Sequence, residues 1–384
     1  MATICSCDVD QNGNDRALGW TVATSRWGTL FPRMRLAKAN GHGRFGIVHS
    51  NLEICLVNTF FRAGFRLATL LGVSLFLAHP SSVLAAPKTT TIETLPAVMV
   101  GDRVVDIAYN LGVLPECMSV RASLWPMADK FKTVSQPVGC PKCVTTARKN
   151  AVPGALKTHG ISRVIIEKND QFCLFTPGLK PENVVPLLKD SGASIEYVDF
   201  SQGLDTAIRQ TAKLLNREAQ GEELIAKHTK ELAEVQAGLP QSAKGKTVVI
   251  INGTYQPDTG KCLLRVEAPR YYADKFLLGP LGCANVGDAF KGTAEASNGH
   301  YPVRKIKGEA DLSPLLAANP DVIVMTGDAT AVQQALARQL QTTSDLAKIK
   351  AIRDMAVYAL PLYIDSSVIE YPQILRKWAL ALGR

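Results

Sequence analysis

The stretch Leu-Leu-Ala-Ala-Asn-Pro-Asp-Val-Ile-Val-Met, residues 315–325, decides how the fold of this chain is interpreted. It ends in a continuous apolar run, and the run Thr-Val-Val-Ile-Ile at residues 247–251 has the same β-branched character. Continuous runs of this kind are typical of strands that helices cover on both faces, whereas one-sided strands alternate apolar and polar residues. Both runs therefore predict buried strands of a mainly parallel sheet.

Around these two runs, from Pro96 to the C-terminus, apolar strand-like segments alternate with helical ones. Such alternation predicts an α/β fold with mainly parallel sheets. We expect strands at residues 117–121, 163–166, 195–198, 247–252, 321–325 and 356–360. We expect helices at residues 104–111, 181–191, 204–215, 222–235, 272–278, 331–340 and 371–382.

The segment from Leu204 to Val235 is the longest one without a predicted strand. Its second part places apolar residues and His228 on one stripe of a helix, and Gly238-Leu-Pro240 ends the pattern. We interpret it as a helical connector between two α/β lobes; the alternative is a peripheral helix of a single domain. The predicted organisation is a first lobe at 86–216, a bridging helix at 217–240 and a second lobe at 241–384.

Residues 57–85 have the three parts of a secretory signal peptide. Arg62 and Arg66 precede an apolar run at 67–78, and Ser-Ser-Val-Leu-Ala-Ala-Pro follows at 81–87. A run of about 12 apolar residues is too short to cross a bilayer core of roughly 30 Å as a helix, which argues against a transmembrane anchor. Small side chains at Val83 and Ala85 place cleavage after Ala85.

Residues 1–56 precede this signal and have a mixed composition without clear periodicity. We interpret them as an upstream extension that is either not translated or not structured. No cysteine lies at the cleavage point. We therefore expect a mature protein that begins at Ala86 and is periplasmic, and soluble rather than lipid-anchored.

The net charge of the chain, +9, is unevenly distributed. Residues 1–85 hold eight Lys or Arg and four Asp or Glu, so the remainder carries 35 basic and 30 acidic residues. No dense basic block interleaved with aromatic residues occurs in that remainder. A mild positive excess of this kind is typical of a solvated surface, and we expect no nucleic-acid partner.

Four segments carry a resemblance to a known family. Asp106-Ile-Ala-Tyr-Asn-Leu-Gly-Val-Leu-Pro-Glu116 resembles an opening helix with an "LGVLPE" turn, and Asn216-Arg-Glu-Ala219 with Leu224-Ile225 resembles the entry to a bridging helix. Residues 315–324 are similar to an "LLALNPDVIIV" segment, the most specific of the four, and residues 349–361 to a late "AVKNGRVYAVP" strand. All four belong to the substrate-binding proteins of ABC importers for iron-siderophores, haem and cobalamin, and the resemblance covers about residues 95–382.

The resemblance implies two α/β lobes with mainly parallel sheets, joined by a single bridging helix, with the ligand cleft between them. It implies a monomeric solute-binding protein, not an enzyme, that captures a metal chelate of the siderophore, haem or corrinoid class. An ABC permease and its ATPase are the implied partners. No cofactor is required, although the transported ligand would contain iron or cobalt. Family members dock on the permease through glutamates, and Glu309 and Asp311 lie close to the second-lobe docking position.

The mature chain contains six cysteines, at positions 117, 140, 143, 173, 262 and 283. An even number in an oxidising compartment favours disulfides, although six cysteines allow 15 pairings. Assignment of the cysteines to lobes predicts a pair between Cys262 and Cys283 in the second lobe. The other four cysteines lie in the first lobe.

Cys140-Pro-Lys-Cys143 is the most distinctive motif, and three interpretations stay open. It is a structural disulfide, a site for a soft metal or a metal cofactor, or a redox pair. The redox interpretation comes last because the sequence does not clearly place the motif at the start of a helix after a strand. His300 is a further candidate metal ligand, and Val144 in place of a histidine argues against covalent c-type haem attachment.

In two-lobed α/β binding proteins the ligand contacts loops at the carboxyl ends of strands. Aromatic and arginine side chains on such loops suit a flat or chelated anionic ligand, through stacking and bidentate pairing with carboxylates. The residues 298–304 and 365–367 lie on loops of this kind. The predicted ligand-binding residues are Trp125, Tyr255, Arg265, Arg270, Tyr271, Tyr301 and Arg304.

Catalytic motifs are absent from the sequence. Ser201 and Ser366 lie in no nucleophile elbow, and neither HExxH nor GxxxxGK[ST] occurs. The leading hypothesis is therefore a periplasmic chelate-binding protein. The alternatives are a cysteine-based metal-binding or redox protein on the same scaffold, which uses Cys140 and Cys143, and an enzyme on that scaffold.

Overall fold

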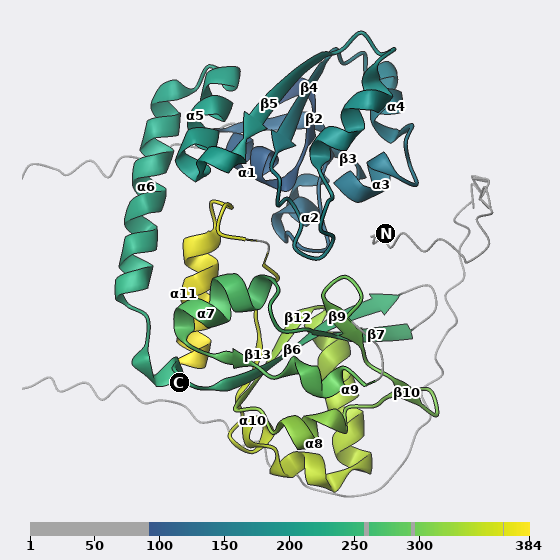
Figure 1. Ribbon diagram of the computed structural model, residues 1–384, viewed down its shortest axis with the longest axis vertical. Coiled ribbons are helices and arrows are strands. Elements are labelled where there is room, and N and C mark those ends of the chain that lie inside the picture. The colour runs from purple at the N-terminus through teal and green to yellow at the C-terminus, as the bar shows by residue number, and fades with distance from the viewer. Residues whose placement is uncertain (1–91, 257–260, 293–295, 364) are drawn as a thin grey trace, which may run out of the picture. The chain divides into compact units, whose positions relative to one another are not determined.

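Five parallel strands form the sheet of the first lobe, in the spatial order β3-β2-β1-β4-β5. The computed structural model describes residues 92–256, 261–292, 296–363 and 365–384, which belong to one compact unit (Figure 1). The predicted signal peptide and the upstream extension lie outside the described residues. The strands are β1 Glu93–Val100, β2 Val113–Ser119, β3 Gln136–Gly139, β4 Arg163–Lys168 and β5 Ser194–Asp199.

Helices cover both faces of this sheet, as its continuous apolar strands require. Successive residues of β1 point to opposite faces, and Val98, Met99 and Val100 are all fully buried. The α-helices are α1 Asp102–Asn110, α2 Met127–Phe131, α3 Pro141–Thr145, α4 Ala151–His159 and α5 Leu204–Leu215. Two short 3₁₀ helices, η1 Pro181–Leu188 and η2 Phe200–Gln202, complete the lobe.

The second lobe has a mixed sheet in the order β13-β12-β6-β7-β9, with β8 paired to β6. β12 runs parallel to β6 and β13, whereas β7 runs antiparallel to both β6 and β9. The strands of this sheet are β6 Thr247–Gln256, β7 Lys261–Glu267, β8 Ala284–Asn285, β9 His300–Pro302, β12 Val322–Gly327 and β13 Val357–Ala359. A separate small hairpin consists of β10 Lys305–Ile306 and β11 Glu309–Ala310.

The helices of the second lobe lie between and after these strands. The α-helices are α7 Gly279–Leu281, α8 Pro314–Ala318, α9 Ala329–Thr342, α10 Lys350–Arg353 and α11 Tyr371–Leu382. The shorter 3₁₀ or π helices are η3 Gln241–Ala243, η4 Asp274–Leu278, η5 Gly287–Phe290 and η6 Ser344–Lys348.

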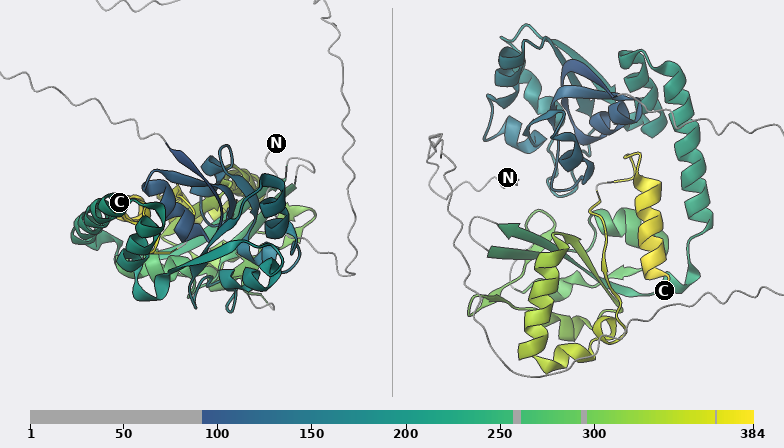
Figure 2. Two further views of the ribbon diagram at one scale, coloured as in Figure 1. Left: turned by 90° about the horizontal axis from the view of Figure 1, so that it is seen from above. Right: turned by 180° about the vertical axis from the view of Figure 1, so that it is seen from behind.

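One helix, α6 (Glu218–Ala237), leads from the first sheet to the second. Its buried stripe contains Leu224, Ile225, His228 and Val235, the stripe that the sequence pattern predicts. The helix packs against α5 of the first lobe and α11 of the second, and Figure 2 shows α6 and α11 side by side. A Cβ atom at Gly221 would lie 2.7 Å from that of Ala212, so this glycine allows the close approach of α5 and α6.

All six predicted strands are found, and the helices predicted at 204–215 and 371–382 coincide with α5 and α11. The sequence missed β1, the central strand, because Pro96 interrupts it. The register of β1 against β2 shifts between Leu95 and Val98, so the proline lies at an irregularity, where a missing N–H is tolerated. Helix α4 was also missed, because it contains Pro153 and Gly154.

Candidate functional site

Charged side chains are buried at the carboxyl edge of the first sheet, where ligands bind in open α/β sheets. Asp102 and Arg103 follow β1, Arg121 follows β2, and Glu167 lies near the end of β4. Each of these four residues is at most 4% exposed. Buried charges persist only when they are paired and hydrogen-bonded, so the partners of each group define the site.

Arg121 connects the two lobes. Its Nε atom and its backbone N–H both donate to the carboxylate of Asp102. Its Nη1 atom donates to the Phe172 carbonyl oxygen at 2.7 Å and to the hydroxyl of Tyr272, in the second lobe, at 3.0 Å. Burial alone would lower the pKa of Arg121, but the adjacent Asp102 carboxylate outweighs this and raises it well above its ordinary value, so the group stays cationic.

Arg103 forms a second buried ion pair. Its Nε atom donates to Glu167 Oε1 at 2.5 Å, and its backbone N–H donates to Oε2 at 3.1 Å. Its Nη1 atom lies 3.4 Å from Asp365 Oδ2, which belongs to the second lobe. Burial raises the pKa of Glu167 to about 7, against the opposing effect of Arg103. Gly101 makes room for this carboxylate, because a Cβ atom there would lie 2.3 Å from that of Glu167.

A third contact between the lobes involves Asp106 of α1. Its Oδ2 atom accepts the backbone N–H of Ile369 at 2.6 Å, next to Glu370 at the start of α11. Glu370 in turn accepts a hydrogen bond of 2.7 Å from Nε1 of Trp125. Burial and the neighbouring Glu370 carboxylate raise the pKa of Asp106 well above its ordinary value.

Trp125 follows β2 as the sequence analysis expected, but the structure buries it. Only 1% of its surface is exposed, and its ring meets that of Phe131 edge to face at a centroid distance of 5.4 Å. With its one N–H group bonded to Glu370, the side chain presents no stacking face to a ligand. We therefore assign Trp125 to the core that joins the lobes, which corrects the expectation that it is a ligand contact.

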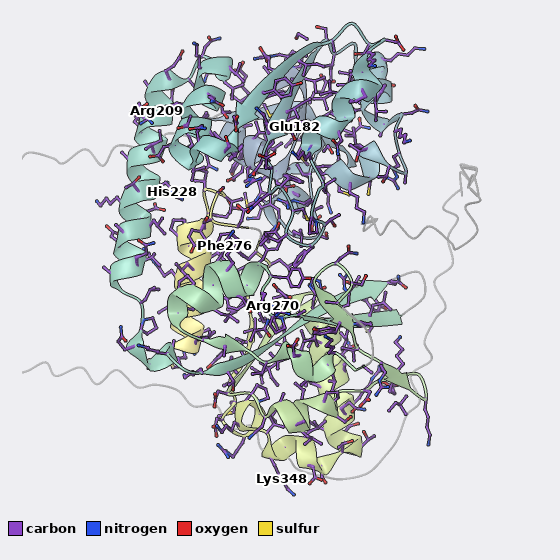
Figure 3. All side chains as sticks on the ribbon, in the orientation of Figure 1. Glu182, Arg209, His228, Arg270, Phe276 and Lys348 are labelled. Atoms are coloured by element: carbon purple, nitrogen blue, oxygen red, sulfur yellow. The ribbon has the colours of Figure 1, made fainter. Side chains whose placement is uncertain are left out.

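Four predicted residues of the second lobe are exposed. Arg265 donates from Nη2 to Asn252 Oδ1 at 3.3 Å, whereas Arg270 has a left-handed backbone (φ 75°) and donates its N–H to Asp274 Oδ2. Figure 3 shows Arg270 and Phe276 on the segment between β7 and α7. The exposed set is Tyr255, Arg265, Arg270 and Arg304.

The remaining predicted aromatic residues divide into two groups. Tyr301 is buried inside the second lobe, and its hydroxyl donates to Asp288 Oδ1 at 2.7 Å. Tyr271 and His300 instead contact Phe175 of the first lobe, with ring centroids 5.6 and 4.9 Å away. Burial lowers the pKa of His300 to about 4, so this imidazole is neutral at physiological pH.

Sequence reasoning missed the segment 169–180, between β4 and η1, which supplies Phe172 and Phe175. Phe172 is fully buried, and its ring lies 4.0 Å from the Arg121 guanidinium and 5.6 Å from that of Arg103. The rule that nominated the other loops applies here too, because this segment follows the carboxyl end of the strand predicted at 163–166.

The predicted pairing of Cys262 with Cys283 is wrong. Cys262 pairs with Tyr255 near one end of β6, whereas Cys283 precedes β8, whose Ala284 pairs with Thr247 at the other end. Eight residues of strand separate these positions by roughly 25 Å, far beyond the reach of a disulfide. Both cysteines are free thiols, as are Cys117 and Cys173.

The Cys140–Cys143 motif lies at the carboxyl end of β3. Its two sulfur atoms are 2.7 Å apart, which is longer than the roughly 2.05 Å of a disulfide bond. Cys140 is the N-cap of α3, and its sulfur accepts the N–H of Cys143 at 3.3 Å. The motif therefore does open a helix after a strand, which corrects the reason for placing the redox interpretation last.

The two predicted docking residues differ in exposure. Glu309 is exposed and lies 3.4 Å from Arg338 of α9. Asp311 is buried, and it accepts hydrogen bonds from the backbone N–H and the hydroxyl of Ser313, just before α8. Asp311 therefore organises its own loop and offers no accessible carboxylate to a partner.

Three further features of the described residues bear on function. Two surface cavities, of about 350 and 380 Å³, lie along α6. Within the described ranges, no three His, Cys, Asp or Glu side chains are grouped so that they could hold a metal ion, so His300 belongs to no such group there. None of the helices described is long and apolar enough to cross a membrane.

Comparison with known proteins agrees with the fold. Residues 183–363 match a family model described as periplasmic binding protein. A search of curated proteins found no match. Among solved structures, the periplasmic haem-binding protein BhuT in complex with two haems is 16% identical, with a TM-score of 0.50; the similarity covers 75% of this chain and 97% of that one.

Two further solved structures are similar over the same share of this chain. The periplasmic haem-binding protein RhuT from Roseiflexus sp. RS-1, in apo form, is 16% identical over 75% of this chain and 97% of its own, with a TM-score of 0.49. The iron-uptake system-binding protein FeuA from Bacillus subtilis is 16% identical over 75% of this chain and 94% of its own, with a TM-score of 0.48. At 16% identity, the likeness to BhuT is one of fold.

Proposed function

We propose that this chain is a periplasmic binding protein, as the match of residues 183–363 suggests, and that its two lobes capture a metal chelate. The chelate is of the siderophore, haem or corrinoid class, and the protein delivers it to an ABC permease. One solved structure of similar fold is described as a periplasmic haem-binding protein in complex with two haems, which supports this choice of ligand class.

The contact between Arg121 and Tyr272 carries the proposal. It joins the carboxyl edge of the first sheet to the segment after β7, with 3.0 Å between Nη1 and the hydroxyl oxygen. A ligand between the lobes would therefore meet a guanidinium group and an aromatic ring together. Guanidinium groups pair with carboxylates and aromatic faces stack on ring systems, so this combination suits an anionic chelate with a conjugated part.

The exposed residues of the second lobe extend this surface. We propose that Tyr255, Arg265, Arg270 and Arg304 form its rim and that Tyr271 lies deeper, beside Tyr272. Tyr301 supports the rim through its bond to Asp288. The protein needs no cofactor of its own, and the iron or cobalt belongs to the ligand.

Export and partners complete the proposal. The signal at residues 57–85 would direct a monomer to the periplasm, where an ABC permease with its ATPase would receive the ligand. Glu309, which is exposed, is the better candidate for docking than the buried Asp311.

Titration with haemin, a ferric siderophore and cobalamin tests the proposal, with absorption and intrinsic fluorescence as readouts. Arg121→Lys keeps the charge but loses the fork of donors, so binding should weaken about tenfold or more. Arg163→Lys is the matched control, because Arg163 also bonds a carboxylate and a backbone carbonyl, at the opposite edge of the sheet. Failure of all three chelates to bind the wild-type protein contradicts the proposal.

The position of Cys140 and Cys143 supports a second candidate function, a thiol–disulfide redox pair. In the reduced form of the motif, the two thiols would lose two protons and two electrons to a disulfide-containing partner, the two sulfur atoms would be joined, and the partner would be reduced to two thiols. Equilibration with reduced and oxidised glutathione, followed by mass spectrometry of the 140–143 peptide, tests this function. A redox pair gives a reversible two-electron transition, whereas a fixed redox state at every ratio excludes it.

A further inference from the structure

The segment 169–180 is a compact loop held between the two lobes; we call it the Phe loop. Its ends are joined by an ion pair of 2.6 Å between Asp170 and Lys180. Phe172, Cys173 and Leu179 form a small buried cluster of their own, with Phe175 packed against it. Closed ends and a core made from its own side chains are the properties of an Ω-loop.

On the first-lobe side, the Phe loop covers the carboxyl edge of the first sheet, where Arg103 and Arg121 lie. The Phe172 ring lies over the guanidinium of Arg121 and within 5.6 Å of that of Arg103, and the Phe172 carbonyl accepts from Arg121. In the described structure, Arg121 Nη2 and the hydroxyl of Ser119 are both buried without a hydrogen-bond partner. Buried donors are normally satisfied, so this edge has donor capacity that the loop does not use.

On the second-lobe side, Phe175 inserts among three rings. It meets Tyr272 edge to face at 4.8 Å and His300 at 4.9 Å, and Tyr271 lies 5.6 Å away. The backbone N–H of Leu174 donates to the Tyr272 hydroxyl at 2.9 Å. Phe175 also contacts Gly299 so closely that a Cβ atom there would lie 2.3 Å from the phenyl ring.

We propose that the Phe loop is an internal occupant of the ligand site, and that the ligand takes its place when it binds. This inference rests on the proposed function and narrows it. The loop presents flat rings to two guanidinium groups and to an aromatic recess, and a carbonyl oxygen to Arg121. The ligand that replaces it shares this chemistry: a flat, conjugated ring system with oxygen acceptors at its edge. A globular chelate such as a ferric trihydroxamate offers no flat ring to the same surfaces.

Displacement of Phe175 and direct contact with it predict opposite changes in ligand affinity when Phe175 is removed. If Phe175 contacts the ligand, its removal weakens binding; if Phe175 competes with the ligand, its removal strengthens binding. A single aromatic pair accounts for a change of about two- to tenfold in affinity. Phe175→Ala should therefore bind haemin about two- to tenfold more tightly than the wild-type protein.

A glycine pair provides the matched test. Gly299→Ala drives a methyl group into the Phe175 ring, whereas Gly308→Ala, in the β10–β11 turn, meets nothing within 4 Å. Both positions have positive φ, 72° and 86°, so the backbone strain of the two variants is similar. Gly299→Ala should tighten haemin binding like Phe175→Ala, and Gly308→Ala should not change it.

Hydrogen exchange of the full-length protein decides the inference without reliance on affinity. Haemin should increase amide exchange in residues 172–175 of the wild-type protein, and Gly299→Ala should increase it without any ligand. Greater protection of these amides on haemin binding, or weaker binding by Phe175→Ala, overturns the inference but leaves the proposed function intact. Absence of haemin binding in every variant, together with binding of a non-planar chelate, overturns the inference alone; absence of binding by every chelate overturns both.

Discussion

Replacement of Trp125 by phenylalanine should lower the free energy of unfolding by about 2 kcal/mol more than the same replacement at Trp378. The two indoles are equally buried, at 1% exposure, and each lies in the hydrophobic cluster that contains residues of both lobes. They differ in the hydrogen bonding of the indole nitrogen. Trp125 Nε1 donates to Glu370 at 2.7 Å, whereas Trp378 Nε1 has no hydrogen-bond partner in the described structure.

The figure of about 2 kcal/mol is a lower bound that follows from this difference. Both substitutions remove a similar part of a buried ring, so the packing losses largely cancel in the comparison. A hydrogen bond to a charged group contributes roughly 1.5–3 kcal/mol, and a buried donor left unpaired costs about 1–3 kcal/mol. Trp125→Phe loses the bond, whereas Trp378→Phe removes an unpaired donor.

Urea denaturation followed by circular dichroism measures both effects. The midpoint should fall further for Trp125→Phe than for Trp378→Phe, with the slope unchanged. In a Glu370→Ala background the difference between the two variants should shrink, because the acceptor of Trp125 is gone. If the two variants had equal midpoints with Glu370 unchanged, the role assigned to this hydrogen bond would be refuted.

Three further predictions concern other parts of the molecule. The pKa of His300, about 4 in the folded protein against about 6.5 unfolded, makes its contribution to stability fully present above pH 6.5 and lost as pH falls toward 4. The loss should reach about 3 kcal/mol in urea titrations across this range and be absent from His300→Gln; identical pH profiles would contradict it. The Cβ atom of Gly101→Ala would collide with Glu167, whereas Gly160→Ala has a positive φ but open space around it. The free energy of unfolding should therefore be lower for Gly101→Ala than for Gly160→Ala, by at least about 2 kcal/mol. Comparable thermal midpoints would count against this packing. Under denaturing, non-reducing conditions Cys262 and Cys283 should both react with a thiol reagent, and a peptide that links them would disprove the register of β6 with β7 and β8.

Local patterns predicted the strands because their signal is local. The runs at 247–251 and 321–325 are apolar on both faces, and the structure buries them as β6 and β12. β1 was not predicted because Pro96 interrupts its apolar pattern, although β1 pairs with a strand on each side and is the central strand. Tertiary contacts overrode the weak local preference there.

The candidate site was predicted only in part, because its contacts join distant residues. Arg121 and Tyr272 are separated by 151 positions, and Asp106 and Ile369 by 263, so no local pattern indicates either contact. Ligands bind at loops that follow the carboxyl ends of strands, and this rule correctly placed Trp125 on the loop after β2. It could not show whether the side chain points into the core or toward the ligand. The partner of the Trp125 N–H group, Glu370, comes from the other end of the chain, so no local pattern indicates this contact either.

The most direct test of the central claim is the mass and absorption spectrum of the protein purified from its native compartment under non-denaturing conditions. We expect a stoichiometric, non-covalent chelate that contains iron or cobalt, absorbs visible light and is lost on denaturation. A protein recovered without any such ligand, and unable to take up haemin, a ferric siderophore or cobalamin afterwards, would contradict it.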